Sequence, residues 1–270
     1  MKNRPGLTIF TGVLATSCCV VASVTFAVEP TPHGGTIPTH SYTLVFSDDF
    51  STDPNSNGKW TVFRRQGNLN EEGYWDPIQK AWYLTTQATN LATAAFANYE
   101  LTAKFWKIDF RFKVDNGPMG ADGFVFMFYK DKSAYLTRLP DSGTYMAFQT
   151  RNVNGSDNAV AGYGLQFDTF EYSNCDPLLE NYVAVIQNVV CNSALVYRPL
   201  PKIDDNIWHY VEFTYHNGHL TCTIDHQTVH GFTICHPDYT YSGIGFGAGT
   251  GSYTSNQIID DFQIWVANDE

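Results

Sequence analysis

The chain has 270 residues, of which 15% are aromatic and 16% charged, and its 16 basic and 27 acidic residues give a net charge of −11. An acidic chain of this kind repels nucleic acid and anionic lipid, so we expect neutral or cationic partners instead.

The first 27 residues have the layout of a secretory signal peptide. Lys2 and Arg4 form a short basic start, residues 7–27 are uncharged, and small residues precede an expected cleavage before Val28. The alternative is an uncleaved signal-anchor, because about twenty apolar residues can span a bilayer. Cleavage removes two basic residues and leaves 14 basic and 27 acidic ones, a net charge of −13. It predicts a secreted, extracellular or cell-surface protein with no further membrane insertion.

Residues 28–41 are rich in Pro, Gly and Thr, show no periodicity and are expected to form a linker. Residues 42–268 form the expected domain, long enough for one large all-β unit or two small ones. They contain no convincing helical spacing. In residues 106–115, apolar and polar side chains alternate strictly, which predicts a strand with one buried and one solvated face.

Further strands follow along the chain. Residues 124–129 and 182–190 are apolar on both faces, as in the middle of a packed sandwich. Residues 210–225 contain two strands joined at Asn217-Gly218, a dipeptide typical of a type I′ hairpin turn. Residues 241–266 are a strand, a Gly/Ser/Thr loop and another strand. The pattern predicts an all-β fold, a two-sheet antiparallel β-sandwich of the jelly-roll type.

Four cysteines remain after signal cleavage, because Cys18 and Cys19 leave with the signal peptide. An even number in an oxidising compartment predicts two disulfides, with three possible connectivities. We favour pairing between neighbours in the sequence, and no CxxC pair indicates a zinc site. The favoured pairs are Cys175–Cys191 and Cys222–Cys235.

Polar residues interrupt the strand-like stretch 164–185. Asp168, Asn174 and Asp176 can meet one cation if the chain turns back just after the strand. Carboxylate, amide and backbone carbonyl oxygens are the ligands that Ca²⁺ prefers. The alternative is a polar loop whose Asp and Asn side chains cap its own turns.

Three motifs, in their order and spacing, resemble those of the legume-type (L-type) lectins, which have the concanavalin A-like fold. They are "GADGFVFMF" at 120–128, "FDTF" at 167–170 with its following Asn and Asp, and "GIGFGAGTGSY" at 243–253 before the last strand. The resemblance extends from residue 44 to the end of that strand. It implies a non-catalytic, calcium-dependent lectin that binds a neutral sugar, glycan or glycoprotein.

The resemblance also implies roles for individual residues. Asp122 accepts hydrogen bonds from two adjacent sugar hydroxyls and follows a cis Ala121–Asp122 peptide bond. Residues 247–253 correspond to the family's variable specificity loop. Apart from the resemblance, Phe170 or Tyr172 can offer an aromatic face to the sugar, and we favour Tyr172 because Phe170, in phase with Asp168, can equally pack in the core. The calcium ligands are Asp168, the backbone carbonyl of Phe170 and Asp176. The loop between the two aspartates is one residue shorter than usual and the family's asparagine position carries Tyr172, so Asn174 is inferred as a further ligand from the shape of the loop. The carbohydrate-binding residues are Asp122, Tyr172, Asn174, Gly249, Thr250 and Gly251.

The sequence departs from the family pattern at two ligands of its transition-metal site. Gln166 replaces a glutamate and Asn181 a histidine, and a neutral amide is a weak ligand for such ions. We therefore expect calcium without the transition metal. The family's glycine that donates a backbone N–H to the sugar has one candidate here, Gly155, which also lies in the glycosylation sequon Asn154-Gly155-Ser156.

Two other functions stay open. A retaining glycoside hydrolase on the same fold needs two carboxyl groups about 5–5.5 Å apart. The strand at 166–171 offers only one carboxylate on each face, Asp168 and Glu171. The acids of 71–76 are expected in a loop. A degenerate adhesion module would bind neither sugar nor calcium. A homo-oligomer formed through the sheet faces is compatible with each reading.

Four histidines cluster around the hairpin at mixed spacing. These histidines are expected to be surface strand residues rather than metal ligands. The four residues are His209, His216, His219 and His226.

Overall fold

The structure, a computed structural model, describes residues 40–115, 120–135, 138–151, 157–158, 161–172, 181–191, 194–233 and 240–268. The predicted signal peptide, the linker up to residue 39, and the sequon at Asn154 lie outside these ranges. In the part of the chain described, no helix has the length and apolarity needed to cross a membrane.

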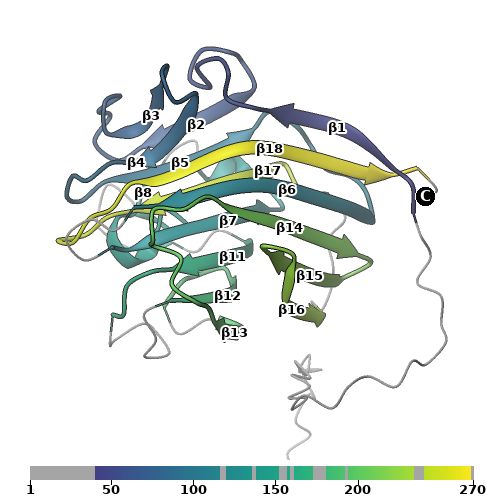
Figure 1. Ribbon diagram of the computed structural model, residues 1–270. Helices are drawn as coiled ribbons and strands as arrows, with labels where there is room; N and C mark the ends of the chain where they lie inside the picture. The colour runs from purple at the N-terminus through teal and green to yellow at the C-terminus, as the bar shows by residue number, and fades with distance from the viewer. Residues whose placement is uncertain are drawn as a thin grey trace, which may run out of the picture.

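Two antiparallel β-sheets form the molecule, with their strands running across the view in Figure 1. In strand order, the described residues of one sheet form β16 (Gln227–Thr233), β15 (His219–Ile224), β14 (His209–His216), β6 (Phe105–Val114), β18 (Gln257–Ala267), β4 (Ala81–Thr85) and β3 (Glu72–Asp76), with β1 (Tyr42–Asp48) paired to β18. Those of the other form β13 (Ala194–Pro199), β12 (Tyr182–Gln187), β11 (Gly162–Asp168), β7 (Gly123–Tyr129), β17 (Gly243–Gly249), β5 (Ala92–Ala97) and β2 (Trp60–Arg64).

A small third sheet and two 3₁₀ helices lie in the connection between β7 and β11. They are β8 (Leu139–Pro140), β9 (Thr150–Arg151), β10 (Asp157–Asn158), η1 (Lys132–Tyr135) and η2 (Gly143–Tyr145). The all-β sandwich expected from the sequence is confirmed, and these short 3₁₀ turns are the helical structure within the described ranges.

Strand β6 has the two faces that its alternating sequence predicts. Its apolar side chains from Trp106 to Val114 are fully buried between the sheets. Asp109 lies on the other face, yet it is only 5% exposed because Lys107 Nζ lies 3.1 Å from its carboxylate. On this outer face, the acidic side chain is therefore covered by its basic partner rather than exposed to solvent.

The turns follow the sequence closely, with one difference in length. Asn217 and Gly218 both have positive φ, 49° and 87°, which confirms the type I′ hairpin between β14 and β15. The strand expected over 182–190 ends earlier, at Gln187. Asn188 has a φ of 64°, and its side-chain oxygen accepts a hydrogen bond from the Gly162 N–H at 3.1 Å, which stops the pairing.

The core between the sheets is built largely of aromatic rings. Phe246 of β17 packs against Phe110 of β6, with ring centroids 5.0 Å apart, and against Phe262 of β18 at 5.3 Å. Phe124 and Phe167 stack at 4.6 Å. Such pairs stabilise a core beyond the area they bury, and they hold the strands that lead into the functional site.

The predicted Cys222–Cys235 disulfide is wrong. Cys222 is a free cysteine, fully buried on the inner face of β15 between Leu220 and Ile224. Burial raises the pKa of its thiol, so it behaves as a small apolar side chain. Cys191 is disulfide-bonded, but its partner lies outside the described residues, and the pairing with Cys175 stays a prediction.

Cys222 should resist thiol reagents until the domain unfolds, because only the exposed thiolate reacts. We expect maleimide labelling followed by peptide mapping to modify Cys222 in denaturant and to leave it unmodified in the native protein. Recovery of a peptide in which Cys222 is linked to Cys235 would contradict this assignment.

Candidate carbohydrate-binding site

Three neighbouring strands end, or begin, at the same edge of the seven-stranded sheet. Gly123, which opens β7, is paired with Asp168 at the end of β11 and with Gly249 at the end of β17. The backbone of Asp122 joins both neighbours: its N–H donates to the Gly249 carbonyl, and its carbonyl accepts from the Thr169 N–H, each at 3.2 Å. Residues far apart in the sequence therefore meet around Asp122.

The "ADG" motif is explained by this close approach of backbones. The Ala121–Asp122 peptide bond is cis, as the resemblance implies. Gly123 has a φ of 124°, and a Cβ at this position would lie 2.2 Å from the Phe167 carbonyl oxygen. Only glycine fits there, and the strand pairing beside Asp122 depends on it.

The loops that follow these strands enclose a pocket of about 430 Å³. This volume lies within the range of about 300–1,000 Å³ that is usual for small-molecule sites. The lining residues are Asp122, Ser142, Gly143, Thr144, Tyr145, Phe170, Glu171, Tyr172, Gly251, Ser252 and Tyr253.

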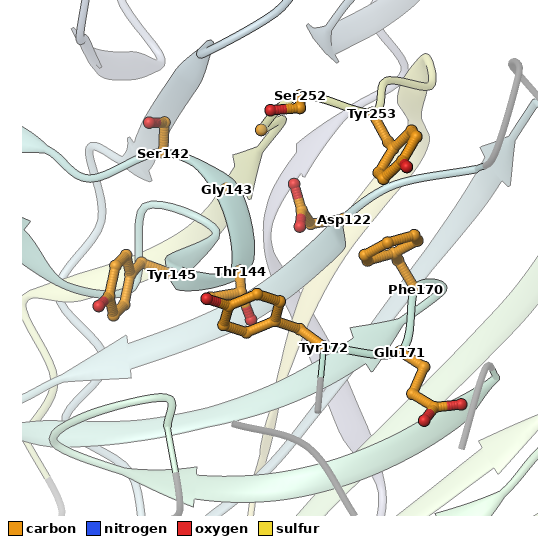
Figure 2. A pocket seen from close by; sticks show the side chains of 11 residues that line it. Asp122, Ser142, Gly143, Thr144, Tyr145, Phe170, Glu171, Tyr172, Ser252 and Tyr253 are labelled. Atoms are coloured by element: carbon orange, nitrogen blue, oxygen red, sulfur yellow. The ribbon is translucent and has the colours of Figure 1, made fainter. Parts of the chain in front are cut away.

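Figure 2 shows the Asp122 carboxylate between two aromatic groups. Phe170 and Tyr253 lie on one side, with ring centroids 5.0 Å apart. Tyr145 and Tyr172 lie on the other side. Asp122 is 7% exposed, whereas Tyr172 and Tyr253 are 44% and 45% exposed. The pocket thus has a carboxylate at its base and solvent-exposed rings at its rim.

The wall formed by Ser142–Tyr145 has no counterpart in the sequence-based prediction. The Gly143 N–H donates to the Thr250 carbonyl at 3.1 Å, which fastens this loop to the one after β17. Within the part of the chain that the structure describes, Thr144 Oγ1 is a buried hydroxyl without a hydrogen-bond partner. "DSGTY" carries no local signal of a binding role, so only the tertiary structure reveals it.

Buried tyrosines hold this wall against the sheet. Tyr129 OH donates to the Phe148 carbonyl at 2.5 Å, and Tyr135 OH donates to the Ala147 carbonyl. Burial raises the pKa of both phenols, so they remain protonated donors. Asp141 at the start of the loop forms an ion pair with Arg65 at 3.0 Å. The wall is therefore a fixed part of the pocket.

The loop after β17 lines the pocket with Gly251, Ser252 and Tyr253, whereas the predicted residues were Gly249, Thr250 and Gly251. Gly251 lines it, and a Cβ there would lie 3.4 Å from Asp122 Oδ2. Gly249 is buried in β17, and Thr250 is fully buried beneath the loop, so neither lines the pocket. The Thr250 hydroxyl donates to the Ala88 carbonyl at 2.6 Å and accepts from the Leu91 N–H at 3.0 Å.

Asp168 lies beneath the pocket and is fully buried. Its Oδ2 accepts hydrogen bonds from Gln166 Nε2 at 2.7 Å and from Tyr182 OH at 3.2 Å. Its Oδ1 accepts from the Phe170 N–H at 3.0 Å, which shapes the first turn of the loop. Gln166 thus acts as a hydrogen-bond donor to Asp168.

The second departure from the family pattern, Asn181, also has a structural role. Its side-chain oxygen accepts from the Ile203 N–H at 3.0 Å, and its carbonyl accepts from the Leu200 N–H at 2.9 Å. This asparagine holds the 200–203 turn beside β12.

The remaining predicted calcium ligands, Asn174 and Asp176, lie outside the described residues. Within the described ranges, no group of three or more His, Cys, Asp or Glu side chains converges as a metal site would require. Asp168 and the Phe170 carbonyl are hard oxygen donors of the kind that Ca²⁺ prefers. Their chemistry fits two of the oxygen ligands that a calcium ion takes.

Comparison with known proteins identifies the fold. No family model matches the sequence, and no curated protein matches it. Among solved structures, the VIP36 exoplasmic/lumenal domain with bound Ca²⁺ and Man₃GlcNAc is 18% identical, with a TM-score of 0.59, over 78% of this chain and 86% of that one.

Two other lectin structures are similar in the same way. The Bauhinia forficata lectin in complex with GalNAc is 15% identical, with a TM-score of 0.60, over 85% of this chain and all of that one. The potassium-bound carbohydrate recognition domain of Emp46p is 13% identical, with a TM-score of 0.55, over 79% of this chain and 91% of that one. All of these are L-type lectin folds, as the sequence motifs indicated.

Replacing Thr250 by valine should destabilise the domain by about 1–3 kcal/mol, because the buried Leu91 N–H and the part-buried Ala88 carbonyl lose their partner. Ser252→Ala, two residues away on the exposed rim, is the matched control and should change stability by less than about 0.5 kcal/mol. Urea unfolding curves of both variants measure this difference. Equal stability of Thr250→Val and wild type would show that the hydroxyl does not anchor the loop.

Proposed function

Because the chain has the L-type lectin fold, we propose that it is a carbohydrate-binding lectin that recognises a neutral sugar or glycan without cleaving it. The observation that carries this proposal is the pocket in which the buried Asp122 carboxylate lies below exposed aromatic rings. Sugars combine hydroxyl groups with apolar C–H faces, so this combination of groups suits them.

Asp122 supplies the directional part of the binding. A carboxylate accepts hydrogen bonds only, and its two oxygens can take hydroxyls from adjacent ring carbons. Hydrogen bonds to a charged acceptor are roughly twice as strong as neutral ones. The Thr144 hydroxyl, buried at the pocket wall without a partner in the described part of the chain, offers a further donor or acceptor.

The aromatic rim supplies the apolar part of the binding. Tyr172 contributes a ring face on one side of the pocket, and the Phe170–Tyr253 pair contributes one on the other. Tyrosine also keeps a hydroxyl at the rim, where one end of the ring is apolar and the other wet. Gly251 leaves room beside the Asp122 carboxylate for the ligand.

Calcium would organise the site from below. We propose that Asp168, the Phe170 carbonyl, Asn174 and Asp176 hold the ion, and that Asn174 donates its amide to the sugar. When bound, calcium supplies a fixed positive charge that keeps the loop after β11 in one conformation. The VIP36 structures include a Ca²⁺- and mannose-bound form, which makes Man₃GlcNAc and mannose the first ligands to test.

The location of the protein belongs to the same proposal. A signal peptide at residues 1–27 would direct the domain at 42–268 to the secretory route, after a linker. The disulfide at Cys191 supports an oxidising compartment. A secreted or cell-surface position would bring the pocket to glycans and glycoproteins.

A glycoside hydrolase is the second candidate, since Asp122 and Glu171 both line the pocket. Glu171 is exposed, and its side chain points away from Asp122 in Figure 2, which does not favour a catalytic pair. The other acid considered in the sequence, Glu72, lies on strand β3 and not in the loop that was expected. It is fully buried, and its carboxylate accepts hydrogen bonds from the backbone N–H groups of Gln66, Gly67 and Ala92. Release of reducing ends from a glucan or mannan substrate would favour hydrolysis instead.

Replacing Asp122 by asparagine should weaken glycan binding about 10- to 100-fold, because charge-assisted hydrogen bonds worth about 1.5–3 kcal/mol are lost. Tyr172→Ala should weaken it about fivefold through loss of the ring face. The control is Tyr197→Ala, because Tyr197 is 43% exposed, like Tyr172, but lies on β13 and does not line the pocket. Isothermal titration with Man₃GlcNAc and a glycan array measure these effects.

The role of Asp122 is refuted if Asp122→Asn binds every glycan on the array as the wild type does. A loss in Tyr197→Ala equal to that in Tyr172→Ala would contradict the placement of the aromatic rim.

Removing calcium should abolish glycan binding, and adding it back should restore it. We expect equilibrium dialysis to detect bound calcium in the wild type and none in Asp168→Ala. A protein that binds neither calcium nor any glycan would instead be the adhesion module considered from the sequence.

A further inference from the structure

One corner of the sandwich, remote in sequence from the glycan loops, brings two histidines together. His40 precedes β1, and His216 is the last residue of β14. His216 is paired with Phe105, the first residue of β6, and with His219 across the hairpin. In Figure 1, the start of β1 and the end of β18 lie at the same side of the molecule.

The two imidazoles face each other through the same type of nitrogen. His40 Nε2 lies 3.4 Å from His216 Nε2. Phe105 supports both rings: it stacks on His40 at 4.7 Å with planes 22° apart, and contacts His216 at 4.4 Å with planes 36° apart. The pair is therefore positioned by an aromatic side chain of a third strand.

This separation is the one that a shared metal ion requires. Two imidazole nitrogens bound to one tetrahedral ion at about 2.0–2.1 Å lie about 3.3–3.4 Å apart. Imidazole suits Zn²⁺, Ni²⁺ and Cu²⁺, whereas calcium takes oxygen ligands. We propose that His40 and His216 form a chelating site for a divalent transition-metal ion, separate from the proposed calcium site.

Binding of a metal at this pair depends on pH. A metal binds the neutral imidazole, so protons compete with it. His219 lies opposite His216 on the hairpin, and it is the third imidazole of this corner.

The site would have two protein ligands, and water would fill its remaining positions. No group of three or more His, Cys, Asp or Glu side chains converges in the part of the chain that the structure describes, which predicts reversible binding rather than a permanent structural ion. For a fixed ligand set, affinity rises from Ni²⁺ to Cu²⁺ and falls again at Zn²⁺. Cu²⁺ should therefore bind most tightly.

Metal at this position would tie three segments of the chain together. His40 is followed by Ser41, whose carbonyl accepts a hydrogen bond from the Asn268 N–H at 3.0 Å. The ion would thus link the hairpin end to the strand that starts the sandwich and, through it, to the residue after β18.

The test titrates the full chain, with its calcium saturated, with CuCl₂ and ZnCl₂. Isothermal titration should detect one equivalent of Cu²⁺, and the electron paramagnetic resonance spectrum should show nitrogen couplings. His40→Gln and His216→Gln should each weaken Cu²⁺ binding at least tenfold. The matched control is His226→Gln, because His226 lies in the same hairpin region but contacts Tyr210 instead.

Unchanged Cu²⁺ affinity in His40→Gln and His216→Gln would overturn the site, as would an equal loss in His226→Gln. Circular dichroism of each variant checks that the sandwich is folded, and the glycan array is run in parallel. Since neither histidine lines the pocket, glycan binding should persist in all three variants. Loss of copper binding with intact glycan binding distinguishes this proposal from the lectin proposal.

Discussion

The pairing of β7 with β11 on one side and β17 on the other is the constraint on which the rest of the site depends. It places Gly123 beside both Asp168 and Gly249, so that three loops start from one edge of one sheet. The contact between Gly123 and the Phe167 carbonyl tolerates no side chain. A larger residue there would part the strands and displace the Asp122 carboxylate at the base of the pocket.

Much of this arrangement was predictable, for physical reasons that differ from element to element. Period-two alternation defined β6, and the conformational demand of a type I′ turn located the hairpin at Asn217-Gly218. The position of Asp122 next to Asp168 was implied by the resemblance of the motifs to those of L-type lectins. These features depend on local chemistry or on a pattern that spans the chain.

Other features depend on tertiary contacts that leave no local signal. The wall at Ser142–Tyr145 is followed by the Ala147 and Phe148 carbonyls, which accept hydrogen bonds from buried phenols of β7 and η1. Thr250 looked like a ligand-binding residue of a glycine-rich loop, yet it is the hydroxyl that anchors that loop. Cys222 was assigned to a disulfide from an even count of cysteines, whereas the side-chain alternation of β15 directs it inward.

The sandwich also depends on a pairing between two strands that are far apart in the sequence. The first strand of the sandwich, β1, has its partners on the last one, with Tyr42 opposite Ala267 and Asp48 opposite Phe262. During synthesis, β1 must wait for nearly the whole domain before its backbone finds a partner. Contacts of such sequence separation form slowly, and an unpaired strand edge invites association with other chains. Molecular chaperones would therefore meet an open-edged intermediate until β18 has been synthesised.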